Sequence, residues 1–520
     1  MSDRMREWAE ELSTLQNKAV DTLVNVRPPA DAHIRLSEDV EKFLEEKGES
    51  ADEILQLPVI VPLPVDDARP LRDYFISSSH NTYLLSGQLL GHSSALSYVH
   101  VLWQHARCVE MDVWSSARGL VVTHGYTLSS AVLFREVCEA VGQAVREHDW
   151  PVLVSLECHV SVEGQPEIVQ IMEECWGERL VRGPLGVEGT KSEVTPKDLK
   201  GRIMVMVEYY PPKNSEDTES QNAPPSSSSN DSSSDDESPG VEAKLAKPPK
   251  PSPISDTLAE LGVYARSMKP SKDWLTTHIT YPAHVMINIS ESALSALIPH
   301  SLDALIANAQ RHLRRVYPRG TRIESSNPDP LASWSSGSQI AALNWQRYDL
   351  GVQMNEAMFA GTPGWVVKPK KLLGQVPSTD GRKMRLKCHV VGLSSLPVGK
   401  ERTNVAAYVR AHLLYTGVPK DASTQWRSET VLCKNPEEGL ADYFWDARFA
   451  FEYDADSVTF IRIRIKENIK YERDAERAAV VARVEQVQPG WRLMRMLDNQ
   501  GKYLGATLLV HFEFEDVEAA

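Results

Sequence analysis

The sequence lacks the features that mark several large classes of protein. It has no run of about 18 apolar residues, so we expect no transmembrane segment. Its six cysteines form no Cys-x-x-Cys pair and no zinc-type spacing, which is typical of reduced, mostly packed thiols. Lys and Arg number 56 against 71 Asp and Glu. The resulting net charge of −15 argues against binding to nucleic acid, which needs a basic face.

The composition is that of a globular chain, with 42% aliphatic and aromatic residues and 24% charged residues. At about 150 residues per domain, the length predicts three or four domains. The first residues, MSDRMREWAEELSTL, are charged and helical in pattern, where a signal peptide would need an apolar run. We therefore expect a cytoplasmic protein.

The apolar pattern divides the chain into five segments. Residues 1–67 predict a helical region. Residues 68–210 and 256–373 alternate strand-like and helical runs, which is typical of α/β units around a parallel sheet. Residues 211–255 are an acidic, Ser/Pro-rich linker that we expect to be disordered. Residues 380–518 contain short alternating strands, which predict an antiparallel β-sandwich.

Two helices can be placed more closely. The first begins after Ser37 and ends at Gly48, with an apolar face made of Val40, Phe43 and Leu44. The second follows a strand at 284–289, and its apolar positions are Leu302, Leu305, Ile306 and Leu313.

Polar residues suited to catalysis are concentrated in four runs: SSSHNTYLLSGQL, CVEMDVW, THGYTL and SLECHV. On a strand, side chains two residues apart share a face, so Glu110 and Asp112 project together. In an α/β barrel, polar residues at strand ends face the mouth where substrates bind. Asn81 and Glu157 could complete a cation site made only of oxygen ligands. Such a site suits calcium or magnesium and does not suit zinc.

Two histidines, His80 and His124, lie at the same kind of strand end. Beside a divalent ion, one imidazole can stabilise a pentacovalent phosphorane and the other can protonate a leaving alkoxide. Any one of these residues taken alone is more often a structural, hydrogen-bonded residue. The spacing by itself therefore predicts only a metal-assisted α/β hydrolase.

Taken together, the four runs resemble the X half of eukaryotic phosphoinositide-specific phospholipase C. The runs HLRRVYPRGTRIESSNPDP, ALNWQ and GWVVKP resemble its Y half. The resemblance covers roughly residues 68–373 and extends more loosely to the last segment, which looks like the C2 domain of the family. It implies a split TIM-like barrel, a C-terminal C2-like β-sandwich and a short helical amino-terminal region, similar to an EF-hand remnant, without a PH domain.

The resemblance also implies an activity: calcium-dependent cleavage of inositol phospholipids to diacylglycerol and an inositol phosphate, through a cyclic phosphate, at the inner face of a membrane. By motif position, the implied calcium ligands are Asn81, Glu110, Asp112 and Glu157. The resemblance makes His80 and His124 the catalytic histidines. Glu110, or alternatively Glu157, would act as the general base.

In the Y half, Arg315 and Tyr317 match the family's inositol-binding arginine and tyrosine, and Asn288 stands where a serine contacts a phosphate. The family also binds the 4- and 5-phosphates with a Lys-x-Lys pair, and an ungapped match puts Met206 and Glu208 at those positions. Losing two ammonium groups removes charge-assisted bonds of about 1.5–3 kcal/mol each and adds like-charge repulsion. We therefore expect weakened selectivity for the 4,5-bisphosphate.

Membrane contact also departs from the family pattern. Leu89 and Leu128 occupy rim positions where apolar side chains insert, but Thr321 stands where an aromatic residue is common. The run LPVGKERTNVAAYV lacks the aspartates of calcium-binding sandwiches, which makes a calcium clamp there doubtful. The acidic linker is either a plain spacer or a regulatory segment that an anionic bilayer would repel.

Two other functions stay open. A catalytically silent phosphoinositide-binding scaffold would use the same barrel and sandwich only as adaptors. It would be free to lose the histidines or the calcium ligands, yet all of them are present. A phosphodiesterase for glycerophosphodiesters also uses metal carboxylates, but it explains neither the sandwich nor the Y-half motifs. We therefore expect the phospholipase.

Overall fold

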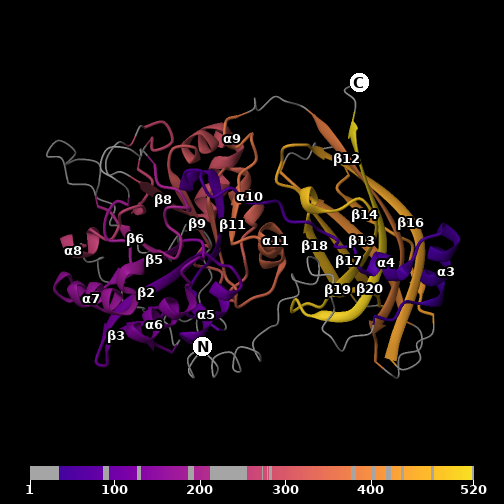
Figure 1. Cartoon of the computed structure of the whole chain (residues 1–520), viewed down its shortest axis with the longest axis horizontal. Helices are drawn as coiled ribbons and strands as arrows, with labels where there is room; N and C mark the ends of the chain where they lie inside the picture. The colour runs from indigo at the N-terminus through magenta and orange to yellow at the C-terminus, as the bar shows by residue number, and fades with distance from the viewer. Residues whose placement is uncertain are drawn as a thin grey trace, which may run out of the picture. The chain divides into compact units, whose positions relative to one another are not determined.

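The computed structural model describes residues 34–85, 93–125, 130–185, 193–210, 254–271, 273–277, 279, 284–375, 382–399, 405–416, 423–434, 439–469 and 473–517. The chain divides into two compact units, shown with the rest of the chain in Figure 1. One, the barrel unit, comprises Asp66–Pro328 and Ser336–Arg347. The other, the sandwich unit, comprises Met1–Val65, Asp329–Ser335 and Tyr348–Ala520.

The barrel unit alternates strands and helices, as the sequence predicts. Its strands are β1 (Tyr74–Ser79), β2 (Cys108–Ser116), β3 (Gly119–Val122), β4 (Val132–Leu133), β5 (Val152–His159), β6 (Ile203–Glu208), β7 (Arg266–Met268), β8 (Val285–Ser290), β9 (Leu313–Tyr317) and β10 (Ile340–Leu343). Its helices are η1 (Leu71–Asp73), α5 (Leu96–Trp103), α6 (Phe134–Ala144), η2 (Val162–Gly164), α7 (Gln165–Trp176), η3 (Gly177–Arg179), α8 (Asp256–Ala259) and α9 (Glu291–Ala309).

Eight parallel strands close into a barrel in the order β1-β10-β9-β8-β7-β6-β5-β2, and the ring closes where Ser78 on β1 pairs with Cys108 on β2. The strands β1, β2, β5 and β6 come from residues before 211, and the other four come from residues after 253. The two halves meet between β6 and β7, where Val207 pairs with Arg266, and between β1 and β10. The predicted split TIM-like barrel is confirmed.

Strand β2 shows why this segment can supply both core and site. Val109, Met111 and Val113 are fully buried on the face away from the barrel axis. The alternate residues Glu110 and Asp112 are also buried, with 4% and 6% of their surface exposed. Both faces of a strand in a closed barrel are covered, so the polar residues on its inward face are shielded from water as well.

Helix α9 differs from the prediction at its end. Ser290 caps its start by accepting a hydrogen bond from the backbone N–H of Ala293, and the helix ends at Ala309. Leu313, predicted on the helix, is instead the first residue of β9. Leu302, predicted on the apolar face, is 38% exposed. From Leu313 onward the chain is extended and pairs with β8 and β10, so the register of the sheet decides the structure of this segment.

The sandwich unit is built mainly from antiparallel strands. They are β12 (Lys383–Pro397), β13 (Ala406–Leu414), β14 (Gln425–Arg427), β15 (Val431–Leu432), β16 (Leu440–Asp454), β17 (Phe460–Asn468), β18 (Ala475–Arg483), β19 (Gly490–Leu497) and β20 (Tyr503–Val517). The unit also contains α3 (Glu38–Lys47), α4 (Ala51–Leu55), α10 (Pro330–Ser335), α11 (Leu350–Phe359), η5 (Val484–Gln486) and β11 (Trp365–Val367).

The nine antiparallel strands form one sheet that folds over a single core. The strand order runs β14-β13-β17-β18-β19-β20-β12-β16, with β15 beside β13. Trp426 on β14 nevertheless stacks on Phe449 on β16, with ring centroids 4.7 Å apart, so the two ends of this order meet. The predicted antiparallel sandwich is confirmed.

Helix α3 packs on the outer face of this sheet. It begins after Ser37, and its C-cap Gly48 has a left-handed backbone conformation, as predicted. Its buried residues Val40, Phe43 and Leu44 belong to one apolar cluster with strand residues such as Leu509. This packing explains why a short helix is stable here.

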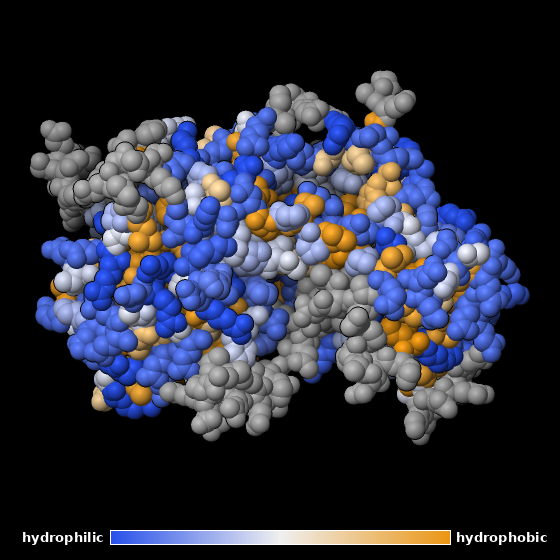
Figure 2. Space-filling model, viewed as in Figure 1, coloured by the Kyte–Doolittle hydropathy of each residue, from blue (hydrophilic) through white to orange (hydrophobic). Residues whose placement is uncertain are grey.

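None of the helices in the described part of the chain has the length and apolar composition of a membrane span. On the face shown in Figure 2, hydrophilic residues cover most of the described surface, and apolar ones are interspersed among them. The large exposed apolar residues in the described ranges are Leu57, Val61, Leu63, Leu85, Tyr210, Leu302, Ile323 and Leu432. Leu85, Tyr210 and Ile323 follow the carboxyl ends of β1, β6 and β9.

The turn before β6 yields a stability prediction. Gly201 has a φ of +66°, and a Cβ atom there would lie 2.4 Å from the backbone oxygen of Glu147. Gly119 has a φ of +94° with nothing within 4 Å of such an atom. We expect Gly119→Ala to lower the free energy of unfolding by backbone strain alone, roughly 1–3 kcal/mol. Gly201→Ala should lower it further because of the added clash. Urea unfolding measures both, and equal losses would contradict the prediction.

Candidate active site

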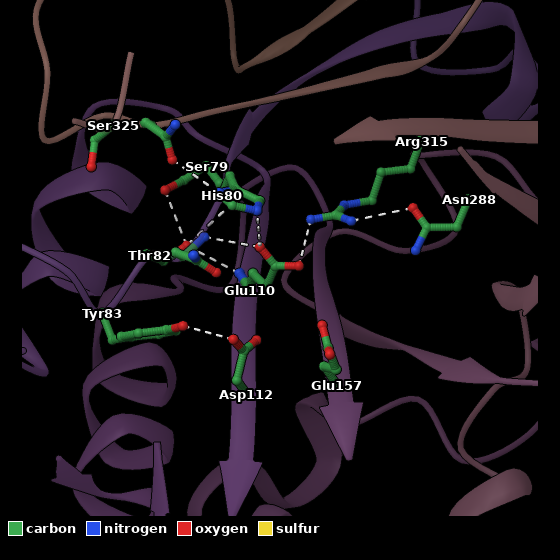
Figure 3. Close-up of polar contacts among 12 residues, drawn as sticks. Ser79, His80, Thr82, Tyr83, Glu110, Asp112, Glu157, Asn288, Arg315 and Ser325 are labelled. Atoms are coloured by element: carbon green, nitrogen blue, oxygen red, sulfur yellow. Dashed lines mark hydrogen bonds and ion pairs between the residues drawn. The ribbon is translucent and has the colours of Figure 1, made fainter. Parts of the chain in front are cut away.

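The predicted site residues converge at the carboxyl ends of β1, β2 and β5, inside the barrel mouth (Figure 3). Glu110 and Asp112 lie on β2, and Asp112 pairs in register with Glu157 on β5. One carboxylate oxygen from each of the three lies within 4.8 Å of the others. Two neighbouring strands therefore supply three carboxylates to one small volume.

The Glu110 carboxylate is held by residues from both halves of the barrel. One oxygen accepts a hydrogen bond from Arg315 Nη2 at 2.6 Å, and the other accepts one from the backbone N–H of Asn81 at 2.9 Å. The backbone of Glu110 is held as well, since its N–H donates to the Thr82 hydroxyl and its carbonyl accepts from Tyr98. Figure 3 shows the Glu110 carboxylate between His80 and Arg315. This carboxylate is fixed in both position and orientation.

Asp112 is buried with incomplete compensation. Its Oδ2 accepts a 2.6 Å hydrogen bond from the Tyr83 hydroxyl, while its buried Oδ1 has no hydrogen-bond partner among the described residues. Burial raises the pKa of Asp112 well above its usual value, and the charges of Glu157 and Glu110 raise it further. A buried carboxylate oxygen without a donor, beside two further carboxylates, is suited to a hard divalent cation.

The donor set therefore fits calcium. Glu110, Asp112 and Glu157 offer carboxylate oxygens, and the Asn81 side chain adds a buried amide at the same strand end. Asn81 has a left-handed φ of 44°, a conformation that asparagine tolerates better than most residues. All four donors are oxygen-bearing, which favours calcium or magnesium over zinc.

His80 lies at the edge of the carboxylate group. Its Nδ1 is 2.9 Å from Asn344 Oδ1, and its Nε2 is 3.8 Å from Glu110. Asn344 is fixed in turn, because its side-chain N–H group donates to the Ser326 carbonyl. Nδ1 of His80 therefore carries the proton and Nε2 faces the site. Burial lowers the pKa of His80, and the charge of Glu110 opposes that shift.

His124 follows β3 and lies within electrostatic reach of the same groups. Burial lowers the pKa of His124, and the neighbouring His80 lowers it further. The backbone next to His124 packs against an aromatic ring, since a Cβ atom on Gly125 would lie 2.0 Å from the indole of Trp114. A side chain at that position would displace the segment that carries His124.

The same indole connects His124 to the carboxylates. Trp114 stacks on His159 with ring centroids 3.9 Å apart, and His159 Nε2 lies 3.0 Å from Glu157 Oε1. Trp114 and His159 occupy paired positions just beyond the Asp112 and Glu157 pair. The loop after β3 and the carboxylate on β5 are thus held by one stack.

The Y-half residues enter the site from the other side of the barrel. Arg315 is 2% exposed, and its Nη1 donates to Asn288 Oδ1 at 3.3 Å while its Nη2 contacts Glu110. Tyr317 is the last residue of β9 and pairs in register with Ser290. The structure thus brings Arg315 and Asn288 together with the carboxylates, and it places Tyr317 at the rim.

Met206 and Glu208, which replace the two expected lysines, also face the barrel mouth. Met206 is buried on β6 in register with Ser155, and Glu208 ends the same strand. Burial raises the pKa of Glu208, with a further contribution from the charge of Glu157, and the Tyr210 hydroxyl donates to Glu208 at 3.0 Å. A half-buried carboxyl group therefore stands where the family pattern has a cation.

Several site residues carry no functional expectation from the sequence alone. Thr82, Tyr83, Trp114 and His159 stand inside the quoted motifs, so motif membership was the available signal. Asn344 also stands inside a quoted motif, ALNWQ, but its contact with His80 arises only through the pairing of β10 with β1. The predicted rim residues Leu89 and Leu128, most of the acidic linker and residues 400–404 of the sandwich loop lie outside the described residues.

Two family models match the barrel half of the chain. Residues 68–209 match the X domain of phosphatidylinositol-specific phospholipase C, and residues 258–371 match its Y domain. The chain belongs to the phosphoinositide-specific phospholipase C family. The site residues predicted from the sequence, from His80 to Tyr317, fall within these two matches.

Individual relatives agree with this family membership. The chain is 30% identical over 461 residues to 1-phosphatidylinositol 4,5-bisphosphate phosphodiesterase delta-3-A of Danio rerio, covering 86% of this chain and 58% of the relative. It is 31% identical over 509 residues to 1-phosphatidylinositol 4,5-bisphosphate phosphodiesterase of Dictyostelium discoideum, covering 89% and 61%. The chain thus spans less than two thirds of the length of either relative.

A solved structure supports the fold. The crystal structure of S. officinalis PLC21 matches 100% of this chain and 69% of its own, with a TM-score of 0.72 and 20% sequence identity. At that identity the match supports the fold of each unit and adds nothing about substrates.

Proposed function

We propose that this protein is a calcium-dependent phosphoinositide phospholipase C. It cleaves inositol phospholipids to diacylglycerol and an inositol phosphate through a cyclic phosphate intermediate, with weakened selectivity for the 4,5-bisphosphate. The observation that carries the proposal is the convergence of three carboxylates, two histidines and one arginine at the mouth of a barrel that belongs to this family.

Calcium would be held by Asn81, Glu110, Asp112 and Glu157. When bound, the ion would lower the pKa of the inositol 2-hydroxyl and neutralise negative charge on the phosphate. The chain itself prepares this place, because Arg315 and the backbone N–H of Asn81 keep Glu110 oriented, and the Tyr83 hydroxyl orients Asp112.

Glu110 is the proposed general base. It would take the proton of the 2-hydroxyl, which then attacks the phosphorus and forms the cyclic phosphate while the bond to the diacylglycerol oxygen breaks. Glu157 is the alternative base, and its Oε1 lies 3.0 Å from His159 Nε2. The fixed orientation of Glu110 favours it for this role.

The two histidines would have different roles: one would stabilise negative charge, and the other would transfer protons. His80 presents Nε2 to the site because Asn344 holds its other nitrogen, so His80 would stabilise the charge that develops on the phosphoryl oxygens. His124 would protonate the departing diacylglycerol oxygen and then draw a proton from the water that opens the cyclic phosphate.

The headgroup pocket supports a preference for fewer ring phosphates. Arg315 and Asn288 would contact one ring phosphate, and Tyr317 would contact the inositol ring. Met206 offers no charge and Glu208 would repel a second phosphate. Phosphatidylinositol, or a lipid with one ring phosphate, is therefore the proposed substrate.

Membrane contact would be shallow and peripheral, at the cytoplasmic face. The exposed side chains of Leu85, Tyr210 and Ile323 follow three strands at their carboxyl ends, which is the end that carries the site. Each buried apolar side chain contributes only about 1.5–3 kcal/mol. Ile323, at 53% exposure, lies close in sequence to Thr321 and supplies the apolar contact that Thr321 lacks.

Calcium binding can be tested without measuring turnover. We expect calcium to raise the thermal unfolding midpoint of the wild-type protein. At a calcium concentration a hundred times Kd, the free energy of unfolding should rise by about 2.7 kcal/mol. Asp112→Asn should abolish this shift. Without calcium it should not lower the midpoint, because a neutral amide replaces a buried carboxylate with a raised pKa. The exposed Asp303→Asn is the control, and an unchanged calcium shift in Asp112→Asn would refute the site.

His124→Ala separates the enzyme from the silent scaffold. We expect the wild-type protein to release inositol phosphate from lipid vesicles in calcium, and the variant to lose about 10²-fold or more of that turnover. His300→Ala, an exposed histidine on α9, is the matched control. A wild-type protein that binds phosphoinositide vesicles without cleaving any lipid would favour the scaffold.

Headgroup preference is tested with phosphatidylinositol, a monophosphate and the 4,5-bisphosphate at equal surface fraction. We expect the bisphosphate to be turned over no faster than the other two, because Met206 and Glu208 replace the two lysines. A strong preference for the bisphosphate would overturn the weakened selectivity and leave the phospholipase activity standing.

A further inference from the structure

Lys269 directly follows β7 and lies beside the end of β6, where Met206 and Glu208 replace the two lysines. Glu208, at the end of β6, pairs in register with Ser267 on β7. Lys269 follows two residues after Ser267, so its Cβ lies on the same face, one step farther toward the mouth. Two residues of extended backbone span roughly 7 Å, a distance that a lysine side chain can cover in reaching back over Glu208.

The register across the next strands extends this row. Met268 on β7 pairs with Ile287 on β8, and Asn288 on β8 pairs with Arg315 on β9. One step along β7 from Met268 therefore brings Lys269 level with Asn288. The register thus puts an ammonium, an amide and a guanidinium at level positions on the inward side, with Lys269 just past the end of β7 and the other two residues on β8 and β9.

The charges around Lys269 agree with that placement. Burial lowers the pKa of Lys269, and the charges of Glu208 and then Glu157 raise it. In return, the charge of Lys269 lowers the pKa of Glu208 against the larger effect of burial. These mutual effects place the Lys269 ammonium within electrostatic range of Glu208 and Glu157.

We propose that Lys269 supplies the ring-phosphate contact that β6 no longer makes, and that Glu208 limits this pocket to a single ring phosphate. The proposal rests on the proposed function, because it names the headgroup of the same lipid substrate. One phosphate dianion would be shared by Lys269 and Arg315 across Asn288. A second phosphate near β6 would face the Glu208 carboxylate, and like charges at close range repel.

The first test measures turnover. Lys269→Met removes the charge and keeps the length of the side chain. We expect turnover on a phosphatidylinositol monophosphate to fall by about tenfold or more relative to phosphatidylinositol, the effect of losing one charge-assisted hydrogen bond. The control is Lys197→Met, an exposed lysine before the amino end of β6, at the opposite end of the barrel. Equal losses on both lipids, or none, would overturn the proposal.

The second test measures binding alone. Calorimetric titration in calcium compares inositol 1-phosphate with inositol 1,4- and 1,5-bisphosphate. We expect Lys269→Met to lower the affinity for at least one bisphosphate by about tenfold or more. The affinity for inositol 1-phosphate should stay unchanged. Glu208→Gln should raise the affinity for inositol 1,4,5-trisphosphate more than the affinity for either bisphosphate, because the repulsion of the second ring phosphate disappears. A trisphosphate gain no larger than the bisphosphate gain would overturn the role of Glu208.

The two tests separate this proposal from the proposed function. If the wild-type protein cleaves none of the lipids, the phospholipase proposal fails and the binding titration still decides the role of Lys269. If the wild-type protein cleaves lipids but Lys269→Met matches Lys197→Met in both tests, the proposal for Lys269 fails and the phospholipase proposal stands.

Discussion

The ion pair between Glu110 and Arg315 is the interaction on which the rest of the site depends. Its 2.6 Å contact joins residues 205 positions apart, from β2 in the first half of the barrel to β9 in the second. Both side chains are almost fully buried. Removing one partner of a buried pair leaves an uncompensated charge, which commonly costs about 3–5 kcal/mol. The pair therefore ties catalytic geometry to the closure of the barrel.

A group of three carboxylates, two buried and one partly buried, is unfavourable for folding, and the structure compensates for it locally. Arg315 neutralises Glu110, the Tyr83 hydroxyl donates to Asp112, and His159 contacts Glu157. The compensation is incomplete, because burial and the neighbouring charges still raise the pKa of Asp112. Instability is thus concentrated where a cation would relieve it, which is typical of sites built for ligands.

Much of this arrangement follows from the sequence, because it depends on local patterns. The two-residue period of CVEMDVW predicts that Glu110 and Asp112 share a face. The caps around α3 and its apolar face follow the helical period in the same way. The prediction failed at Leu313, where a helical period and a strand period both fit and the pairing with β8 and β10 decided.

What the sequence could not give is register between distant strands. Asn344 contacts His80 across 264 residues, and nothing in either motif encodes that contact. Lys269 is level with Asn288 through the pairing of β7 with β8, and with Arg315 only through the further pairing of β8 with β9. The stack of Trp114 on His159 needs both the β2–β5 register and the rings' orientation. The motifs supplied the residue types, and the folded sheet supplied their neighbours.

The junction of β6 and β7 has a consequence for how the gene can be divided. Val207 and Arg266 pair directly, although 58 residues lie between them in the sequence. A backbone break between residues 211 and 253 would sever no described strand pairing of the barrel. Two separately expressed polypeptides could thus reassemble by complementation, and the connecting stretch can change in length with little effect on loop-closure entropy.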